Sequence, residues 1–214
     1  MNRSTTARKS VALLLPVVLL PLVFACSKPK PEAPVDHSAM PGMAGMSGMD
    51  APVTIPPGAR FTAADVHFMQ GMIAHHAQAI YMSRLANENG ANSRVKFLAT
   101  KIDQSQRAEI VQMQGWLVDN GQTAPDTMSY KTMMMQGMLT PAELKELETL
   151  KGVEFDRKFL EYMIKHHEGA IQMVKDLFAA PLSGQETNIN VFANDVELVQ
   201  TAEIAAMYQL LADL

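Results

Sequence analysis

Two histidine pairs are the strongest chemical feature of the sequence. They lie in residues 68–82 and 159–173, which share Phe, Met, Ile, His, His, Ala, Ile and Met at matching positions. Four of the six histidines of the chain belong to these two copies. Imidazole and thioether groups together suit a soft or borderline metal ion. The repeat therefore predicts a metal site with these ligands: His75, His76, His166, His167, Met72, Met82, Met163, Met173 and, in the first copy only, Met69.

Helical geometry limits how each histidine pair can act. Successive side chains on an α-helix diverge by about 100°, so His75 and His76 do not chelate one ion alone. His75 lines up with Met82, and His76 lines up with Met69. We interpret each pair as two half-sites, completed by the second helix of the hairpin or by the other repeat. A structural role for the histidines, with the methionines as packing residues, is the alternative.

A carboxylate on each following helix is the second unusual feature. Glu109 and Glu203, each preceded by a glutamine three residues earlier, fall on the apolar stripe of their helices. A buried carboxylate is costly without a partner, and an imidazole across the hairpin is the nearest candidate. Glu109 and Glu203 either orient a ligating histidine or bind the metal directly. A structural polar network without metal is the third option.

Copper fits the predicted ligands best. Thioether sulfur favours Cu(I), whereas imidazole suits copper or zinc, so Cu(I), with Cu(II) as a second state, is expected before zinc. A methionine recurs at every third position of a segment rich in Gly, Ala and Pro, at Met40, Met43, Met46 and Met49. We predict that these methionines also bind copper; a spacer or an oxidation target is the alternative.

The first residues indicate export. A basic start is followed by an apolar run from Val11 to Phe24 that two prolines interrupt, which is typical of a signal peptide. The run ends in residues 23–26, which resemble the lipobox of bacterial lipoproteins and imply acylation of Cys26. An ordinary signal peptide that leaves a free thiol is the alternative. We expect a periplasmic protein anchored by lipid to the outer membrane, or to the cell surface where only one membrane exists.

The charge balance restricts the partners. The chain has 18 basic and 22 acidic residues, and loss of the leader would remove three cations. A net acidic chain argues against nucleic acid and against an anionic membrane surface, so membrane contact is expected through the lipid anchor only. Metal ions are the expected ligands. A protein that receives the copper, and association of the chain with itself, remain open.

The remaining sequence predicts an all-α fold. We expect a leader at 1–25, a Pro-rich and Met-rich tether at 26–60, and a folded domain at 61–214. Helices are predicted near 62–89, 93–119, 153–179 and 186–213, with a short helix at 141–150. Thr62 with Asp65, and Thr140 with Glu143, are expected to form capping boxes at two of the helix starts. Gly90 is the expected cap at the end of the first helix. The second and fourth helices repeat each other, so a helical hairpin is duplicated, about 62–120 and about 153–213. Two such hairpins predict an antiparallel four-helix bundle without a sheet.

Two expectations concern single positions. His67 should lie on the exposed side of the first helix, opposite its apolar stripe. Phe97 should belong to the buried stripe of the second helix, together with Ile102 and Ile110. Several methionines between residues 128 and 138 either cover one end of the bundle or bind metal.

The repeated Met-Ile-x-His-His segments, with Asp65 and Asp156 upstream and Gln-x-x-Glu on the intervening helices, resemble a bacterial family. It is the "domain of unknown function 305" family, which includes CopM-type periplasmic copper-binding proteins. The resemblance covers residues 61–214. It implies a ferritin-like bundle and, for some members, copper binding linked to copper tolerance. It also implies that the four paired histidines and their flanking methionines are the candidate ligands.

Three functions compete at this point. Copper sequestration, transfer or tolerance is the leading hypothesis, with no enzymatic activity expected. A ferritin-like oxidase that acts on copper is the second, and a structural or partner-binding bundle without metal is the third. Di-iron chemistry is disfavoured because such sites use Glu-x-x-His, whereas Gln112 and Ala206 stand three residues after Glu109 and Glu203.

Overall fold

The computed structural model describes residues 53–89 and 92–214. The predictions for the leader, for Cys26, for Met40, Met43, Met46 and Met49, and for a helix cap at Gly90 lie outside the described residues. All regular elements of the described part are helical, as predicted: α1 (Ala63–Glu88), α2 (Ser93–Asp119), η2 (Ser129–Lys131), α3 (Pro141–Thr149), α4 (Gly152–Ala179) and α5 (Thr187–Ala212). None of these helices is long and apolar enough to cross a membrane.

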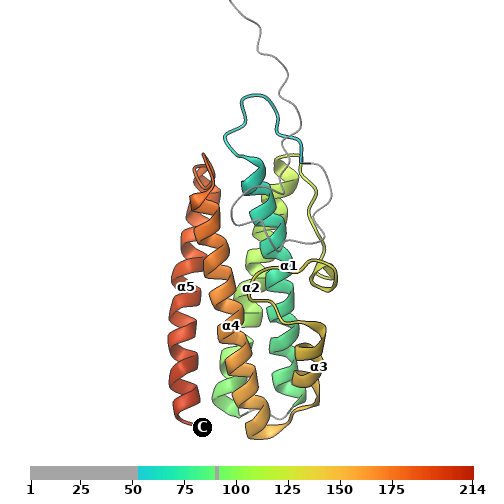
Figure 1. Cartoon of the computed structure of the whole chain (residues 1–214), viewed down its shortest axis with the longest axis vertical. Helices are drawn as coiled ribbons and strands as arrows, with labels where there is room; N and C mark the ends of the chain where they lie inside the picture. Colours follow the sequence, from blue (N-terminus) through green and yellow to red (C-terminus); the bar gives the residue numbers. More distant parts are fainter. Residues whose placement is uncertain (1–52, 90–91) are drawn as a thin grey trace, which may run out of the picture. The chain divides into compact units, whose positions relative to one another are not determined.

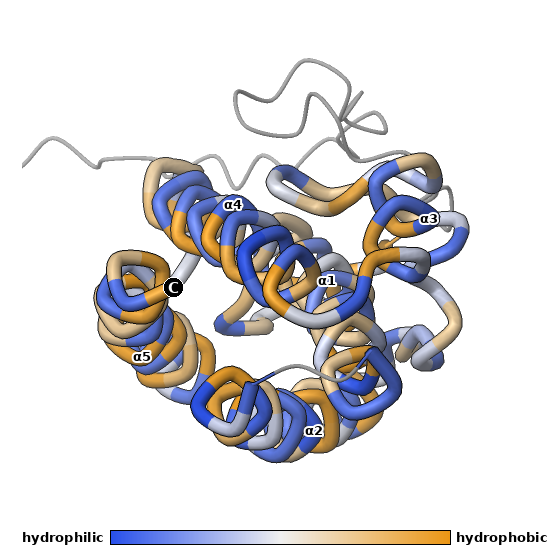
Figure 2. The backbone as a smooth tube through the Cα atoms, turned by 90° about the horizontal axis from the view of Figure 1, so that it is seen from below, coloured by the Kyte–Doolittle hydropathy of each residue, from blue (hydrophilic) through white to orange (hydrophobic). Residues whose placement is uncertain are grey.

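The helices are arranged as two hairpins that meet through one helix each. Helix α1 packs along α2, α4 packs along α5, and α1 and α4 pack against each other. Figure 2, which looks along the long helices, shows α1 beside α4, with α3 on the outer side of α1. Among the described helices, α2 and α5 do not pack closely on each other. Two helical hairpins are therefore present, and their inner helices, α1 and α4, form the central contact (Figure 1).

The repeated aspartates connect the two hairpins at their turns. Asp65 forms the predicted capping box with Thr62 at the start of α1. Its Oδ1 also accepts a hydrogen bond of 2.7 Å from the backbone N–H of Gly184, in the turn between α4 and α5. Asp156, on α4, accepts hydrogen bonds of 3.0 and 3.1 Å from the backbone N–H of Asn92, before α2. The aspartate of each hairpin thus accepts hydrogen bonds from the turn that joins the two helices of the other hairpin.

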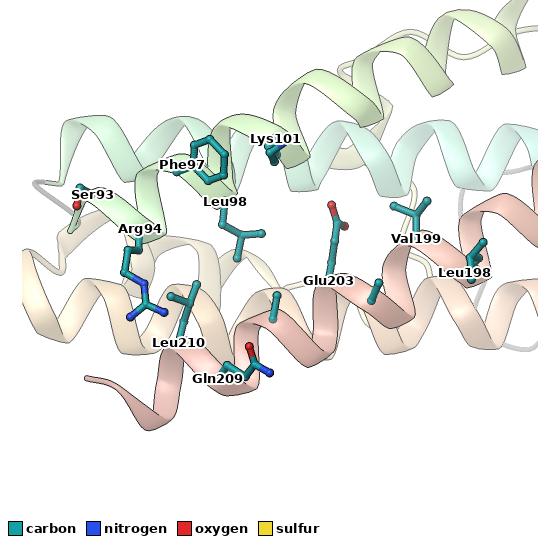
Figure 3. Close-up of a pocket in the computed structure, with 12 residues that line it drawn as sticks. Ser93, Arg94, Phe97, Leu98, Lys101, Leu198, Val199, Glu203, Gln209 and Leu210 are labelled. Carbon is teal, nitrogen blue, oxygen red and sulfur yellow. The ribbon is translucent and has the colours of Figure 1, made fainter.

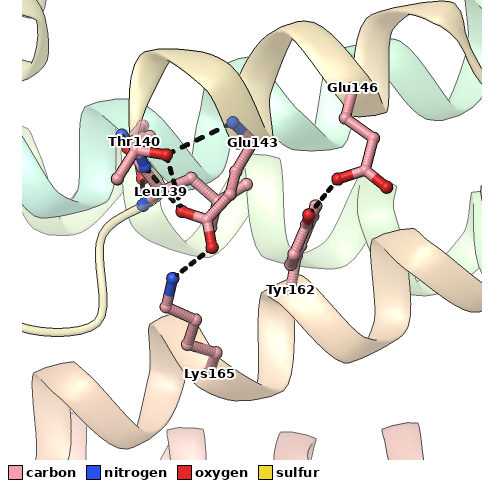
Figure 4. A network of polar contacts seen from close by, with 7 residues as sticks. Leu139, Thr140, Glu143, Glu146, Tyr162 and Lys165 are labelled. Carbon is pink, nitrogen blue, oxygen red and sulfur yellow. Dashed lines mark hydrogen bonds and ion pairs between the residues drawn. The ribbon is translucent and has the colours of Figure 1, made fainter.

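Helix α3 is fastened to α4 by polar contacts (Figure 4). Thr140 and Glu143 form the predicted capping box. Glu143 also accepts a hydrogen bond of 2.6 Å from Lys165 Nζ, and the hydroxyl of Tyr162 donates to Glu146. These contacts fix the end of the connection that runs from α2 to α3.

This connection makes α1 an almost entirely buried helix. Gln70 Nε2 donates 2.8 Å to the Thr123 carbonyl, and Gln78 bonds both the N–H and the carbonyl of Leu139, at 2.7 and 3.0 Å. The expectation that His67 is exposed is wrong, since only 6% of its surface is accessible. His67 lies one helical turn before Gln70, on the side that residues 120–140 cover.

The predicted place of Phe97 in the buried stripe of α2 is also wrong. Phe97 is 64% exposed, whereas its predicted neighbours Ile102 and Ile110 are buried. The buried stripe of α2 runs instead through Val95, Leu98 and Ile102. Phe97 points instead to the side where α5 does not close against α2.

The connection approaches α4 through two glycines. A Cβ on Gly169 would lie 2.1 Å from the Gln136 carbonyl oxygen, and a Cβ on Gly137 would lie 2.6 Å from Gly169 Cα. Gly137 also has φ of +78°, a conformation that other residues rarely adopt. Backbone of residues 136–137 therefore touches the backbone of α4, which no larger side chain at Gly169 would permit.

Changing Gly169 to Ala should destabilise the fold by about 2 kcal/mol or more, because the new methyl group overlaps backbone that cannot rotate away. Gly115→Ala is the matched control, since a Cβ at this helical glycine of α2 meets nothing within 4 Å. The control should gain up to about 1 kcal/mol from helix propensity. Urea unfolding of the full chain measures both changes. Equal stabilities of Gly169→Ala and the parent would contradict the close approach.

Candidate metal centre

Four imidazole rings meet in the contact between α1 and α4. His75, His76, His166 and His167 all have no accessible surface. The rings of His75 and His166 lie 3.7 Å apart between centroids, at an angle of 42°. Within each helix the two rings are 6.5 Å and 6.4 Å apart. The two pairs therefore form one cluster across the helix contact, with His75 and His166 at its centre.

Each outer ring is held by a glutamate of its own hairpin. His76 Nε2 lies 2.5 Å from Glu109 Oε2, and His167 Nε2 lies 2.8 Å from Glu203 Oε2. This is the partner that the sequence predicted for these carboxylates. The glutamates are not fully buried, however, since their side chains remain 23% and 16% exposed. They connect the buried rings to the surface, while the Nδ1 atoms of both rings have no hydrogen-bond partner among the described residues.

The two inner rings differ from each other. His75 Nε2 donates to the Gln136 carbonyl at 3.1 Å, and within the described residues its Nδ1 has no partner. Neither ring nitrogen of His166 makes a well-formed hydrogen bond to the described residues, although the ring lies near the backbone of His75. Burial, and then the neighbouring imidazoles, lower the pKa of both His75 and His166 well below the ordinary value. Both inner rings are therefore neutral near pH 7 and keep a free lone pair.

Sequence reasoning missed Gln136. Its contribution is a backbone carbonyl, which any residue could provide, so its identity carries no signal. The only trace in the sequence is Gly169, which follows the second histidine pair and permits the close approach of the connection. The first repeat has Gln78 at the equivalent position, and this side chain holds the same connection by hydrogen bonds.

Two buried glutamines extend the polar cluster. Gln106 on α2 and Gln200 on α5 are each 2% exposed. In the part of the chain that the structure describes, their amide nitrogen and oxygen atoms have no hydrogen-bond partner. An unsatisfied buried polar group costs about 1–3 kcal/mol, so a ligand that pairs with these atoms would recover stability. The donor set thus fits a bound cation.

The predicted methionines lie in the interior on both sides of the histidines. Met69, Met72 and Met173 belong to one buried apolar cluster, and Met82 and Met163 belong to the other. On α4 the histidine pair lies between the two clusters, with Ile164 in one and Ala170 in the other. Met113 of α2 and Met207 of α5, which are also fully buried, lie in the same two clusters and were not among the predicted ligands.

Carboxylates and imidazoles alone do not complete a metal site here. In residues 53–89 and 92–214, no three His, Cys, Asp or Glu side chains are grouped so that they could hold a metal ion. A cation at the histidine layer would therefore need other donors. The thioethers and the glutamine amides next to the layer are the side chains that could provide them.

The chain matches the family described as domain of unknown function (DUF305) over residues 65–211. It belongs to the DUF305 family. The resemblance predicted from the paired histidine motifs is confirmed. No curated protein matches the chain.

Solved structures of DUF305 proteins share this architecture. A DUF305 protein of Streptomyces coelicolor, named as a candidate secreted protein, is 31% identical, with 70% of this chain and 93% of that chain covered and a TM-score of 0.62. A DUF305 fragment from Deinococcus radiodurans is 31% identical, with 74% and 100% covered and a TM-score of 0.63. CopM in its Cu(I)-bound form is 26% identical, with 70% and 96% covered and a TM-score of 0.56.

The metal-free protein should lose stability as the pH falls below about 6.5, the ordinary histidine pKa. The unfolded chain then takes up protons that the buried rings of His75 and His166 do not accept in the folded state. Each ring should contribute up to about 1.4 kcal/mol of lost stability per pH unit, until its lowered pKa is reached. Urea unfolding of the chelator-treated full chain at about pH 7.5 and about pH 5.5 measures this loss.

The control for this measurement is a His75→Gln/His166→Gln double variant, which has no titrating group at the two inner positions. Its stability should depend less steeply on pH than that of the parent. The same dependence in both proteins would contradict neutral inner rings.

Proposed function

We propose that this chain is an extracytoplasmic, lipid-anchored protein that binds copper, chiefly as Cu(I), to sequester it or to pass it on. The observation that carries the proposal is the layer of four buried imidazoles. Among the described residues, Nδ1 of His75, His76 and His167 has no partner, and His166 makes no well-formed hydrogen bond. The proposal includes a ferritin-like four-helix bundle, in which α1 and α4 supply the histidines.

Within this proposal the glutamates orient the ligands. Glu109 and Glu203 accept the Nε2 protons of His76 and His167, so each ring presents Nδ1 to the metal. Such carboxylate–histidine pairs are common around metal ions, where they fix the tautomer and the ring orientation. His75 and His166 add neutral donors at the centre. The thioethers of the flanking methionines complete the soft ligand set: Met69, Met72, Met82, Met163 and Met173.

Copper relatives support the choice of metal. CopM has been solved with Cu(I), with Cu(II) and with silver bound, at 26–28% identity to this chain. Neutral imidazole and thioether donors suit Cu(I) better than zinc, which accepts thioethers poorly. Zinc is therefore the less favoured ion.

The residues before the helical domain complete the proposal. Residues 1–25 would direct export, Cys26 would carry the lipid, and residues 26–60 would be a tether to the helical domain at 61–214. Met40, Met43, Met46 and Met49 would form a second, Cu(I)-selective binding segment. The DUF305 relative from Streptomyces coelicolor, named as a candidate secreted protein, supports an extracytoplasmic location.

Binding is favoured over catalysis. Glu109 and Glu203 each bond an imidazole of their own hairpin, so they do not face each other as bridging ligands of a di-iron pair. The cluster also lies in the interior, where the rings have no accessible surface. Both features suit storage and transfer of an ion more than turnover of a dissolved substrate.

Anaerobic titration of the full chain with Cu(I) against a chromophoric chelator tests the proposal. Changing His75, His76, His166 and His167 to Ala should remove the copper bound by the helical domain. Changing Met40, Met43, Met46 and Met49 to Leu should remove the copper bound by the tether, and the combined variant should bind none. The two losses should add, because the two groups of ligands are separate.

His67→Gln is the matched control, because His67 is a buried histidine of α1 outside the cluster. It should leave the Cu(I) stoichiometry unchanged. Unchanged stoichiometry in the quadruple histidine variant would refute the buried site. Absence of Cu(I) uptake by the parent would refute the copper function altogether.

A further inference from the structure

Gln106 and Gln200 are buried amides that lack a hydrogen-bond partner among the described residues. Each is 2% exposed, and neither the amide nitrogen nor the amide oxygen of either side chain is bonded there. Exchanging the nitrogen and oxygen positions of an amide does not help, because neither position has a partner. Both side chains therefore need a partner that the described residues do not provide.

The two glutamines have equivalent places next to the histidine cluster. Gln106 stands three residues before Glu109, and Gln200 stands three residues before Glu203. Residues three apart are neighbours on one face of a helix. Each amide therefore lies beside the carboxylate that bonds an outer imidazole of its own hairpin.

The same glutamines lie between the two apolar clusters of the core. On α2 the glutamine stands between Ile102 of one cluster and Ile110 of the other, and on α5 it stands between Val196 and Met207. The histidine pair of α4 also lies between the clusters. Three of the four long helices thus carry buried polar side chains at this boundary, and the histidines of α1 contact those of α4.

The amide nitrogens restrict what could occupy this position. A cation could pair with the amide oxygens, but an amide NH₂ group only donates, so its partner must contain an acceptor. Water and anions both do. An anion is disfavoured, because the carboxylates of Glu109 and Glu203 are adjacent and no Lys or Arg of the described part is buried. Water donates and accepts, so it can pair with both atoms of each amide.

A groove between α2 and α5 brings solvent close to this position. It has a volume of about 660 Å³, and Glu203 is among the residues that line it. Figure 3 shows the Glu203 side chain directed into the space between the two helices. This side chain is 16% exposed, whereas His167, to which it is bonded, is fully buried. One side chain therefore separates the groove from the histidine cluster.

We propose that Gln106 and Gln200 hold water molecules beside the histidine cluster, and that a metal ion uses this water to enter the cluster while the helices stay packed. Four unpaired amide atoms would cost a free energy comparable to the whole stability of a typical domain. An ion that entered an interior without water would lose its hydration at once. Water at the glutamines lets the ion exchange water for imidazole in steps. The entry role rests on the proposed copper function, whereas the water site does not.

ROESY NMR of the ¹⁵N-labelled, copper-free full chain tests the water site. The NH₂ groups of Gln106 and Gln200, assigned with Gln106→Leu and Gln200→Leu, should show dipolar cross-peaks to water, whose sign differs from that of hydrogen-exchange peaks. Gln78 is the matched control, because it is 1% exposed and both its amide atoms bond the main chain of Leu139. It should show no such peak. Absence of the peaks from Gln106 and Gln200 would overturn the water site.

A high-resolution crystal structure of the copper-free parent is a second measurement, and it requires no variant. Ordered water should lie within hydrogen-bond distance of the amide atoms of Gln106 and Gln200. A bound anion at this position, or a direct bond between the two glutamines, would overturn the water site.

The rate of Cu(I) loading tests the entry role. The full chain with Met40, Met43, Met46 and Met49 changed to Leu takes Cu(I) from a chromophoric chelator without oxygen, so that only the helical domain is observed. Adding Gln106→Leu and Gln200→Leu should slow loading about tenfold or more, because the entering ion loses water that nothing replaces. The amount bound should stay the same, because the imidazole and thioether ligands are kept.

Gln112→Leu is the control for this experiment, since Gln112 is an exposed glutamine of α2, and its loading rate should equal that of the parent. Equal rates in the double variant and the parent would overturn the entry role. A parent that takes up no Cu(I) would refute the proposed function instead, and the ROESY result would still decide the water site.

Discussion

Four imidazole rings without accessible surface lie where α1 meets α4, and this burial constrains the rest of the domain. Polar rings in a core need partners. Glu109 and Glu203 supply them for the outer rings, which fixes how each hairpin is aligned. The apolar core forms two clusters, and on α4 the histidine pair lies between them. Packing of these clusters holds the helices, while the histidines keep donor atoms that no described residue satisfies.

The connection between the two hairpins makes their histidine pairs unequal. Residues 136–139 contact both inner helices, through Gln78 on α1 and Gly169 on α4. The Gln136 carbonyl occupies one nitrogen of His75, whereas neither nitrogen of His166 makes a well-formed hydrogen bond to the described residues. The two hairpins thus have equivalent His–Glu pairs at the sides and two unequal rings at the centre. On this account His166 is the more available of the inner ligands.

Local sequence signals predicted what depends on one helix or one hairpin. The capping boxes at Thr62 and Thr140 marked helix starts correctly. A carboxylate on the apolar stripe of α2 predicted a bond to an imidazole of the same hairpin, and the structure has His76 as that partner. Contacts between hairpins were not predictable. Helical spacing gives the position of a residue around its own helix axis, but it does not give the angle and the point at which two helices cross. The contact of His75 with His166 belongs to this class. The exposure of Phe97 does too, because it depends on the separation of α2 and α5.

Histidine ¹⁵N NMR of the full chain, with Met40, Met43, Met46 and Met49 changed to Leu, tests the central claim most directly. Cu(I) is added without oxygen while each ring nitrogen is followed. The account predicts that Nδ1 of His76 and His167 shifts on binding, while Nε2 of both rings keeps the signature of a bond to glutamate. Unchanged spectra of His75, His76, His166 and His167 in a chain that has taken up Cu(I) would contradict it.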